Sequence, residues 1–244
     1  MEIMMMGKDD ILALRPESIQ RALSADEVLH IATMLGAFWK YDYAAAGRGL
    51  AGMHALLKSG LHSDGFFVSK ILLESPKILD IMAYQIVMNI VAKEIPRPDF
   101  VTGVPDGATS LGKRIARMLD VPEAEMKKID GRIVLVTDIP YGSTLLVVED
   151  FCTRGTGFNE AILEIKEKKP RVKFVPYDPV IINRGGLSII PVNGVGDFRI
   201  LPVVELRMRD WDANTCPLCR AGSEPIKPKA SDENWRLITS SQIK

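Results

Sequence analysis

The stretch that decides the fold reads Leu145-Leu-Val-Val-Glu149-Asp150-Phe-Cys-Thr153-Arg154-Gly155-Thr156-Gly157. Four apolar residues run directly into two carboxylates, and a small glycine-containing loop then leads into a helical pattern. This succession is typical of a buried parallel strand, an acidic pair at its carboxyl end, and a turn into a helix. Backbone N–H groups at a helix start favour phosphate, and two carboxylates suit ribose hydroxyls or magnesium. The stretch therefore predicts a site for a sugar phosphate.

The rest of the chain alternates between expected strands and helices. Strands are expected at 100–104, near 122–127, and at 132–137, 144–149, 172–182 and 198–206, with helices at 108–119 and 157–167. Upstream, Ser24-Ala-Asp-Glu27 is a capping box, and Ser75-Pro76 begins a helix that runs to about residue 92. The alternation predicts an α/β fold with a mainly parallel central sheet flanked by helices.

We expect four segments along the chain. They are an N-terminal extension (1–23), an N-terminal helical and hood subdomain (24–98), a core (99–210) and a polar, poorly packed C-terminal tail (211–244).

The chain has 244 residues and a formal net charge of zero, so its composition gives no global electrostatic reason to bind nucleic acid or an anionic membrane. No stretch approaches the ~20 apolar residues of a membrane span, and the N-terminus lacks the pattern of a signal peptide. Three cysteines do not make a disulfide scaffold, so the expected location is the reducing cytoplasm.

Four motifs, in family order over roughly residues 28–229, carry a resemblance to a known family. The acidic-pair stretch resembles the phosphoribosyl-diphosphate (PRPP) motif of type I phosphoribosyltransferases, although Arg154 intrudes. Lys58-Ser-Gly-Leu-His-Ser-Asp-Gly-Phe-Phe67 resembles an orotate phosphoribosyltransferase pattern, and Ile181-Ile-Asn-Arg184 resembles that family's Asp-Arg strand end. The tail Cys216-Pro-Leu-Cys219…Lys227-Pro228 is similar to the tail of one subgroup. The chain thus resembles the orotate phosphoribosyltransferases.

The resemblance implies transfer of ribose 5-phosphate from PRPP to orotate, with Mg²⁺ bridging diphosphate and ribose and held by Glu149 and Asp150 at most through water. It implies a homodimer in which a loop acts across the interface. The implied catalytic residues are Lys58, Asp150, Lys127, Lys128 and Arg132. PRPP would be bound by Glu149, Asp150, Thr153, Arg154, Gly155, Thr156, Gly157, Gly103, Asp106 and Gly107. The base would meet Lys58, Phe66, Phe67 and Arg184.

The stretch 127–140, which matches the family's catalytic loop, departs from the family pattern. Val136 and Thr137 stand where one subgroup has two arginines, and no histidine lies in the loop. Because cations there stabilise the departing diphosphate, Lys127, Lys128 and Arg132 must substitute for them or the reaction is slow. Two other functions therefore stay open: transfer to a different base, and a non-catalytic PRPP- or nucleotide-binding regulator.

Cys216-Pro-Leu-Cys219 has the spacing of half a zinc site. A closed site needs four ligands, and the chain has no second cysteine pair. His30, His54 and His62 are distant in sequence and lack ligand spacing. We therefore expect no metal held directly by protein side chains, with a zinc site shared between subunits as the alternative.

Overall fold

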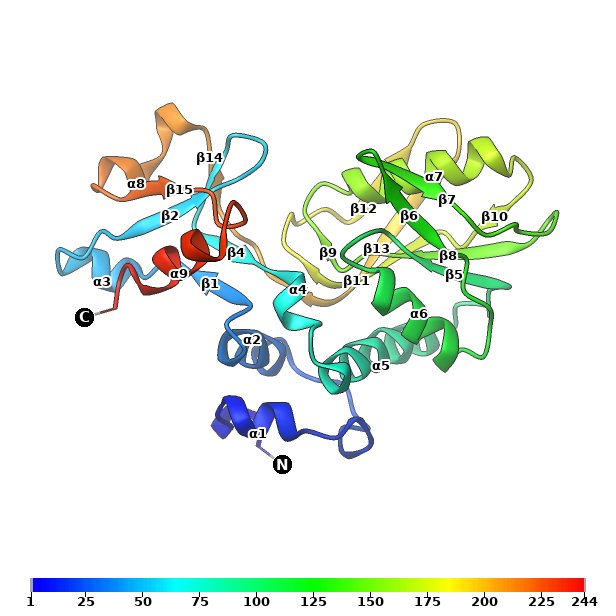
Figure 1. The fold of residues 1–244 in the computed structure, drawn as a ribbon, viewed down its shortest axis with the longest axis horizontal. Helices are drawn as coiled ribbons and strands as arrows, with labels where there is room; N and C mark the ends of the chain where they lie inside the picture. Colours follow the sequence, from blue (N-terminus) through cyan, green and yellow to red (C-terminus); the bar gives the residue numbers. More distant parts are fainter. Residues whose placement is uncertain (1, 244) are drawn as a thin grey trace. The chain divides into compact units, whose positions relative to one another are not determined.

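The computed structural model describes residues 2–243. Contacts between residues divide the chain into two compact units (Figure 1). Unit 1 contains the chain up to Ile31 and Leu72–Arg207, and unit 2 contains Ala32–Ile71 and the chain from Met208 onward. This division groups residues 72–98 with the core sheet, and it groups the tail with the segment around residues 32–71.

Unit 1 is built on a mainly parallel sheet. Strand β8 (Thr144–Val148) pairs in parallel with β5 (Phe100–Gly103) on one side and β10 (Lys173–Phe174) on the other. The short β9 (Phe151–Cys152) pairs in parallel with β11 (Tyr177–Asn183), which pairs in parallel with β13 (Gly196–Glu205). An antiparallel edge strand, β12 (Ile189–Val192), lies beside β13. The α/β fold with a parallel central sheet is therefore confirmed.

Helices cover both faces of this sheet, which explains why its strands β8 and β11 are buried nearly throughout. Helix α7 (Thr156–Lys168) lies on one face, and α5 (Pro76–Ala92) and α6 (Thr109–Met118) lie on the other (Figure 1). The core beneath α7 includes Leu145 and Val147 of β8 with Phe158, Ile162 and Ile165 of α7. The remaining apolar residues of β8 are buried as well, so the strand has no solvent-facing side.

Local sequence signals fixed several of these elements. Ser24 N donates to Glu27 Oε2 at 2.9 Å and Glu27 N donates to Ser24 Oγ at 3.2 Å, so the predicted capping box opens α2 (Ala25–Met34). Ser75 and Pro76 begin α5 as predicted. The N-terminal segment contains α1 (Lys8–Ala13) and is attached to α5, since Gln85 Oε1 accepts from Leu23 N at 2.7 Å.

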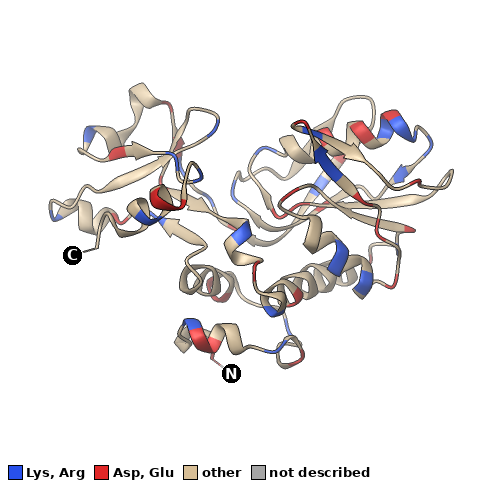
Figure 2. Ribbon diagram, viewed as in Figure 1, with Lys and Arg blue, Asp and Glu red and all other residues tan. Residues whose placement is uncertain are grey.

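Part of the stretch 127–140, for which the sequence predicts the catalytic loop, forms a hairpin. Strands β6 (Met126–Ile129) and β7 (Arg132–Leu135) are antiparallel and are joined by Asp130 and Gly131, which both have positive φ. The backbone of β7 is held by α7, because Ile133 N donates to Glu160 at 3.3 Å and Leu135 N donates to Glu164 at 3.1 Å. Basic residues occur along this hairpin, and its one acidic residue, Asp130, lies in the turn (Figure 2).

Unit 2 contains two small sheets. The antiparallel pair β1 (Phe38–Lys40) and β4 (Gly65–Phe67) forms one. The other has the order β14 (Asp210–Trp211), β3 (His62–Ser63), β2 (Met53–Leu56) and β15 (Glu224–Ile226). Its helices are α3 (Tyr43–Gly47), α8 (Pro217–Arg220) and α9 (Asp232–Ser240). Helix α4 (Ser69–Leu72) begins in unit 2, and its last residue is counted with unit 1.

The expectation of a poorly packed tail was wrong. Strand β15 pairs in parallel with β2, and Leu218 and Ile238 are buried in the core of unit 2. Trp235 Nε1 donates to Gly36 O at 2.9 Å. The tail was hard to recognise because each of its elements is short and buries only one or two side chains. Among the described residues, no helix has the length and apolar character to cross a membrane.

Candidate active site

Glu149 and Asp150 lie at the carboxyl end of β8, where the sheet backbone fixes both. Glu149 N donates to Pro179 O at 3.2 Å, and Asp150 O accepts from Ile181 N at 3.0 Å. Glu149 is buried and Asp150 half-buried. Burial first, and the charge of Asp150 second, raise the pKa of Glu149 to about 8, while the backbone N–H of Phe158 opposes the shift. The acidic pair therefore favours a proton or a cation.

Two glycines lie directly against these carboxylates. A Cβ on Gly107 would fall 2.3 Å from Asp150 Oδ2, and one on Gly157 would fall 3.0 Å from Glu149 Oε1. Gly107 belongs to the loop after β5, in which the Pro105–Asp106 peptide bond is cis. Gly103 ends β5, and its Cβ would fall 1.9 Å from Ala108 O, so this loop is folded tightly over the sheet edge. The predicted residues Gly103, Asp106 and Gly107 are thus brought to the acidic pair.

The loop 153–157 completes this edge of unit 1. Gly155 has a φ of +64° and is the N-cap of α7, and its Cβ would fall 2.5 Å from Ile190 Cδ1. The first N–H groups of a helix lack partners within the helix and attract anions. Arg154 and Thr156 are exposed, whereas Thr153 is half-buried. Their positions suit contact with a phosphate that approaches from solvent.

Arg184 lies next to this loop. Asn183 pairs with Cys152 across β11 and β9, and Arg184 N donates to Cys152 O at 2.9 Å. A Cβ on Gly185 would fall 1.7 Å from Thr153 O, so the two segments touch through their backbones. Arg184 is buried rather than exposed on the surface. Its position at the strand end agrees with the sequence-based expectation, and its role in base binding stays a prediction.

The acidic pair also fits magnesium. Glu149 Oε2 is buried and has no hydrogen-bond partner among the described residues, and Asp150 adds a second carboxylate that is half-exposed. Magnesium takes oxygen ligands and retains several waters, so a pair with an unused oxygen and access to solvent suits it. Asp178, which the sequence analysis missed, is fully buried nearby, and burial followed by the charge of Glu149 raises its pKa. An acid within an otherwise apolar strand was the signal for it.

The remaining expected residues belong to other surfaces. Lys127, Lys128 and Arg132 are exposed on the β6–β7 hairpin of unit 1, and Lys127 pairs with Glu125 at 3.1 Å. Lys58 is exposed in the turn between β2 and β3 of unit 2. Phe67 is buried and stacks on Phe38 with ring centroids 4.3 Å apart. Of the two aromatic residues expected to contact the base, Phe66 is therefore the more exposed.

The expectation that the histidines lie far from the Cys216–Cys219 pair was wrong for two of them. His54 and His62 lie together with Cys216 and Cys219, and one ligand atom from each falls within 4.8 Å of all the others. The register of the β2–β3 hairpin, which has no periodic signal in the sequence, brings these two histidines together. Leu56 pairs with His62, so His54 and His62 share a face of the sheet.

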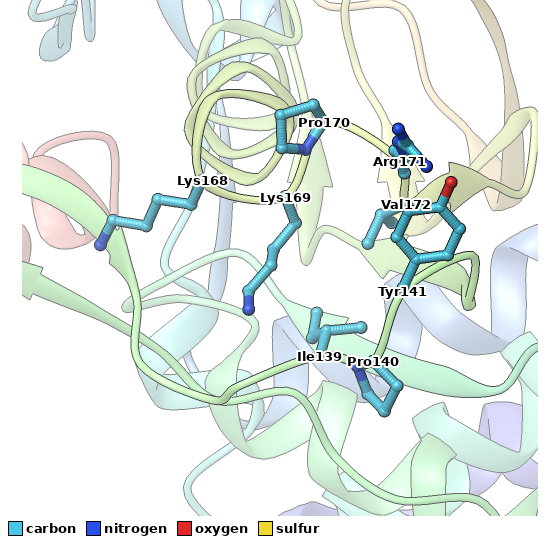
Figure 3. A pocket seen from close by; sticks show the side chains of 8 residues that line it. All are labelled: Ile139, Pro140, Tyr141, Lys168, Lys169, Pro170, Arg171 and Val172. Atoms are coloured by element: carbon cyan, nitrogen blue, oxygen red, sulfur yellow. The ribbon is translucent and has the colours of Figure 1, made fainter.

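A pocket of about 300 Å³ lies between the carboxyl end of α7 and the segment that precedes β8 (Figure 3). It is lined by residues 139–141 and 168–172, where the Arg171 guanidinium stacks 4.4 Å over the Tyr141 ring. These segments precede β8 and β10 in the chain, whereas Glu149 directly follows β8. The pocket therefore lies at the amino ends of the strands, the opposite edge from the predicted phosphate site.

Comparison with known proteins places the chain in a family. A curated orotate phosphoribosyltransferase of a Nitratiruptor species is 30% identical over 196 residues, which cover 76% of this chain and 95% of the relative. Another, from Acidithiobacillus ferrooxidans, is 30% identical over 211 residues and covers 84% and 97%. The chain belongs to the orotate phosphoribosyltransferase family. No family model matches it.

Solved structures agree on the fold of this orotate phosphoribosyltransferase family member. The orotate phosphoribosyltransferase of Aeropyrum pernix has a TM-score of 0.54 at 18% identity and covers 73% of this chain and 93% of its own. The Leishmania donovani UMP synthase has a TM-score of 0.57 at 17% identity and covers 90% of this chain and 43% of its own. The family and its type I phosphoribosyltransferase fold were both predicted from the sequence motifs.

Proposed function

We propose that this protein transfers ribose 5-phosphate from PRPP to a ring nitrogen of orotate, giving orotidine 5-phosphate and diphosphate. One observation carries this proposal. Gly107 packs directly against the Asp150 carboxylate and Gly157 against that of Glu149, beside the amino end of α7. That arrangement suits a ribose with a phosphate on one side and a diphosphate on the other. The identity of about 30% to curated orotate phosphoribosyltransferases favours orotate as the acceptor.

Each part of the substrate has residues suited to it. Glu149 and Asp150 accept hydrogen bonds from the ribose hydroxyls. Residues 153–157 and the first N–H groups of α7 hold the 5-phosphate. The loop with Gly103, Asp106 and Gly107 brings backbone close to the diphosphate, because its glycines leave no side chain in the way. Arg184, Lys58 and Phe66 are the proposed contacts of the base.

The reaction needs positioning and charge stabilisation more than a nucleophile. As the ribose–diphosphate bond breaks, negative charge grows on the diphosphate and positive charge on the ribose. Bound magnesium would neutralise part of the diphosphate charge, and Glu149 and Asp150 would hold it through water. Lys58, Lys127, Lys128 and Arg132 supply the remaining cations, and preorganised groups of this kind are each worth about 3 kcal/mol. The ion pair between Lys127 and Glu125 is exposed and therefore easily exchanged for a phosphate.

The altered loop motivates a second candidate, transfer to another base. Thr137, which stands where one subgroup has an arginine, accepts a hydrogen bond from Glu125 N at 2.8 Å and so has a structural role here. A regulator that binds PRPP without turnover is the remaining alternative. We also propose a homodimer, from the family resemblance, and a reducing cytoplasmic location, because three cysteines do not make a disulfide scaffold.

The deciding experiment measures diphosphate release from PRPP and orotate with Mg²⁺. Asp150→Asn is compared with Asp120→Asn, which changes an exposed acid at a positive φ that asparagine tolerates. Orotate-dependent release that is lost in Asp150→Asn and kept in Asp120→Asn would support the proposal. Release with another base in a panel would identify the second candidate, and PRPP binding without release from any base would identify the regulator.

A further inference from the structure

Four potential metal ligands converge inside unit 2. His54 Nε2 and His62 Nδ1 are 2.8 Å apart, and Cys219 Sγ lies 3.5 Å from the former and 3.3 Å from the latter. Cys216 Sγ lies 3.7 Å from His54 Nε2. Ligand atoms placed at about 2.0 Å (nitrogen) and about 2.3 Å (sulfur) from a tetrahedral zinc ion lie roughly 3.3 to 3.8 Å from each other. The observed sulfur–nitrogen distances match this range, whereas the nitrogen–nitrogen distance of 2.8 Å is about 0.5 Å shorter, so the two imidazoles must separate by that amount to admit the ion.

A network of ordinary hydrogen bonds explains the cluster less well. A hydrogen bond from one imidazole to the other accounts for the 2.8 Å contact, but both sulfurs also approach the same His54 Nε2. A neutral imidazole nitrogen offers one lone pair or one proton, so it cannot serve three partners. A single cation among the four atoms satisfies all of them at once. Two thiolates and two neutral imidazoles would also balance the charge of Zn²⁺, as burial requires.

The surroundings orient the ligands as a metal site requires. His54 Nδ1 lies 2.9 Å from Ser223 Oγ, and a proton on that nitrogen leaves the Nε2 lone pair aimed at the centre of the cluster. His54, His62 and Cys216 are buried and Cys219 is partly buried. Apolar side chains such as Trp39 and Leu218 pack around them. The site is closed by four protein ligands, which is typical of structural rather than catalytic zinc.

The cluster joins parts of the chain that are distant in sequence. His54 and His62 are on the β2–β3 hairpin, while Cys216 directly precedes α8 in the tail and Cys219 lies within it. Unit 2 is made from two segments of about 40 residues each, and a core of this size gains much from a metal. The same hairpin ends in the turn with Lys58, so whatever fixes the hairpin also fixes that turn.

From this geometry we infer that His54, His62, Cys216 and Cys219 bind one structural Zn²⁺ within a single chain, which ties the C-terminal tail to the β2–β3 hairpin. The site is separate from the acidic pair that suits magnesium. The inference does not depend on the acceptor base, and its test reads metal content rather than activity.

The test measures zinc by elemental analysis in the full chain, purified without a histidine tag. We expect about one zinc per chain in the wild type, and at least a tenfold loss in Cys216→Ser/Cys219→Ser and in His62→Gln. Cys152→Ala and His30→Gln are matched controls, since they change the remaining cysteine and histidine and should keep the zinc. Zinc retained in the double cysteine variant would overturn the inference.

Because ligand variants can fail to fold, a second measurement uses the wild type alone. Exchange of the bound metal for Co²⁺ should give the visible bands of tetrahedral cobalt and a near-ultraviolet band from thiolate ligands. A wild-type protein that is free of metal and takes up neither Zn²⁺ nor Co²⁺, with Cys216 and Cys219 reduced or joined as a disulfide, would overturn the inference.

Discussion

Gly107 leaves no room for a side chain beside the Asp150 carboxylate, since a Cβ there would lie 2.3 Å from Asp150 Oδ2. Gly107→Ala must therefore displace either the carboxylate or the loop after β5. Because a shift of about 1 Å at a reacting centre can cost roughly 100-fold, we expect kcat/KM for PRPP to fall by about that factor. Gly47→Ala is the control, because a Cβ at this exposed position meets nothing within 4 Å. Equal activity in the two variants would contradict a role of this contact in placing Asp150.

A second glycine decides how closely α6 packs on β5. A Cβ on Gly112 would lie 2.3 Å from Gly103 N, and backbone cannot move aside as a flexible side chain can. In an exposed helix, glycine to alanine stabilises by about 1 kcal/mol. At Gly112 we expect the opposite sign, a loss of about 1–3 kcal/mol in the free energy of unfolding, because overpacking outweighs helix propensity. Urea unfolding beside Gly47→Ala tests this, and an unchanged or raised midpoint for Gly112→Ala would disprove it.

Local patterns predicted the parts of the molecule that local forces determine. The capping box at Ser24 and Glu27 needs only residues three apart, and the strand into Glu149 and Asp150 is recognisable because both of its faces are buried. The edge with the acidic pair followed from the rule that ligands bind at the carboxyl ends of parallel strands.

The His54–Cys216 contact could not be predicted in this way. It requires the register of one hairpin and the return of a tail more than 160 residues later in sequence, and neither leaves a periodic signal. Two small elements of unit 2, β1 and α3, were missed for a related reason. β1 and α3 span three and five residues, too short for hydrophobic periodicity to be read, and their stability depends on packing with distant segments.

The Arg21–Glu27 pair contributes to the free energy of unfolding, and we expect this contribution to disappear in acid. Nη1 and Nη2 of Arg21 both donate to Glu27, at 2.8 and 2.5 Å, and these bonds are the main reason that the pKa of Glu27 falls from 4.5 to about 2. A lowered pKa in the folded state gives stability that is complete above pH 4.5 and is lost as the pH falls toward 2. We expect Glu27→Gln to cost about 1 kcal/mol at pH 7 and almost nothing near pH 2.

Urea unfolding between pH 2 and 7 measures this difference, with the exposed Glu17→Gln as the control. A constant difference between Glu27→Gln and the wild type across that range would show that lost capping geometry, rather than the charge of Glu27, explains the effect.

The contribution of Glu149 to the stability of the fold has the opposite pH dependence. Burial and the charge of Asp150 raise its pKa from 4.5 to about 8, so the folded protein holds a proton that the unfolded chain releases. The folded state is therefore favoured at low pH, and this contribution disappears as the pH rises from 4.5 to about 8. Each unit of pKa difference corresponds to about 1.4 kcal/mol. Without magnesium or substrate, we expect Glu149→Gln to be more stable than the wild type at pH 8, with an advantage that shrinks toward pH 5.

Glu167→Gln is the matched control, since it changes an exposed carboxylate on α7 and should follow the wild type across the range. Magnesium and PRPP together should reduce the advantage of Glu149→Gln at pH 8, because a bound cation and ribose hydroxyls stabilise the ionised carboxylate that the variant lacks. If Glu149→Gln instead lost stability equally at pH 5 and pH 8, the buried carboxyl would have to be ionised throughout, held by a partner other than the ligand.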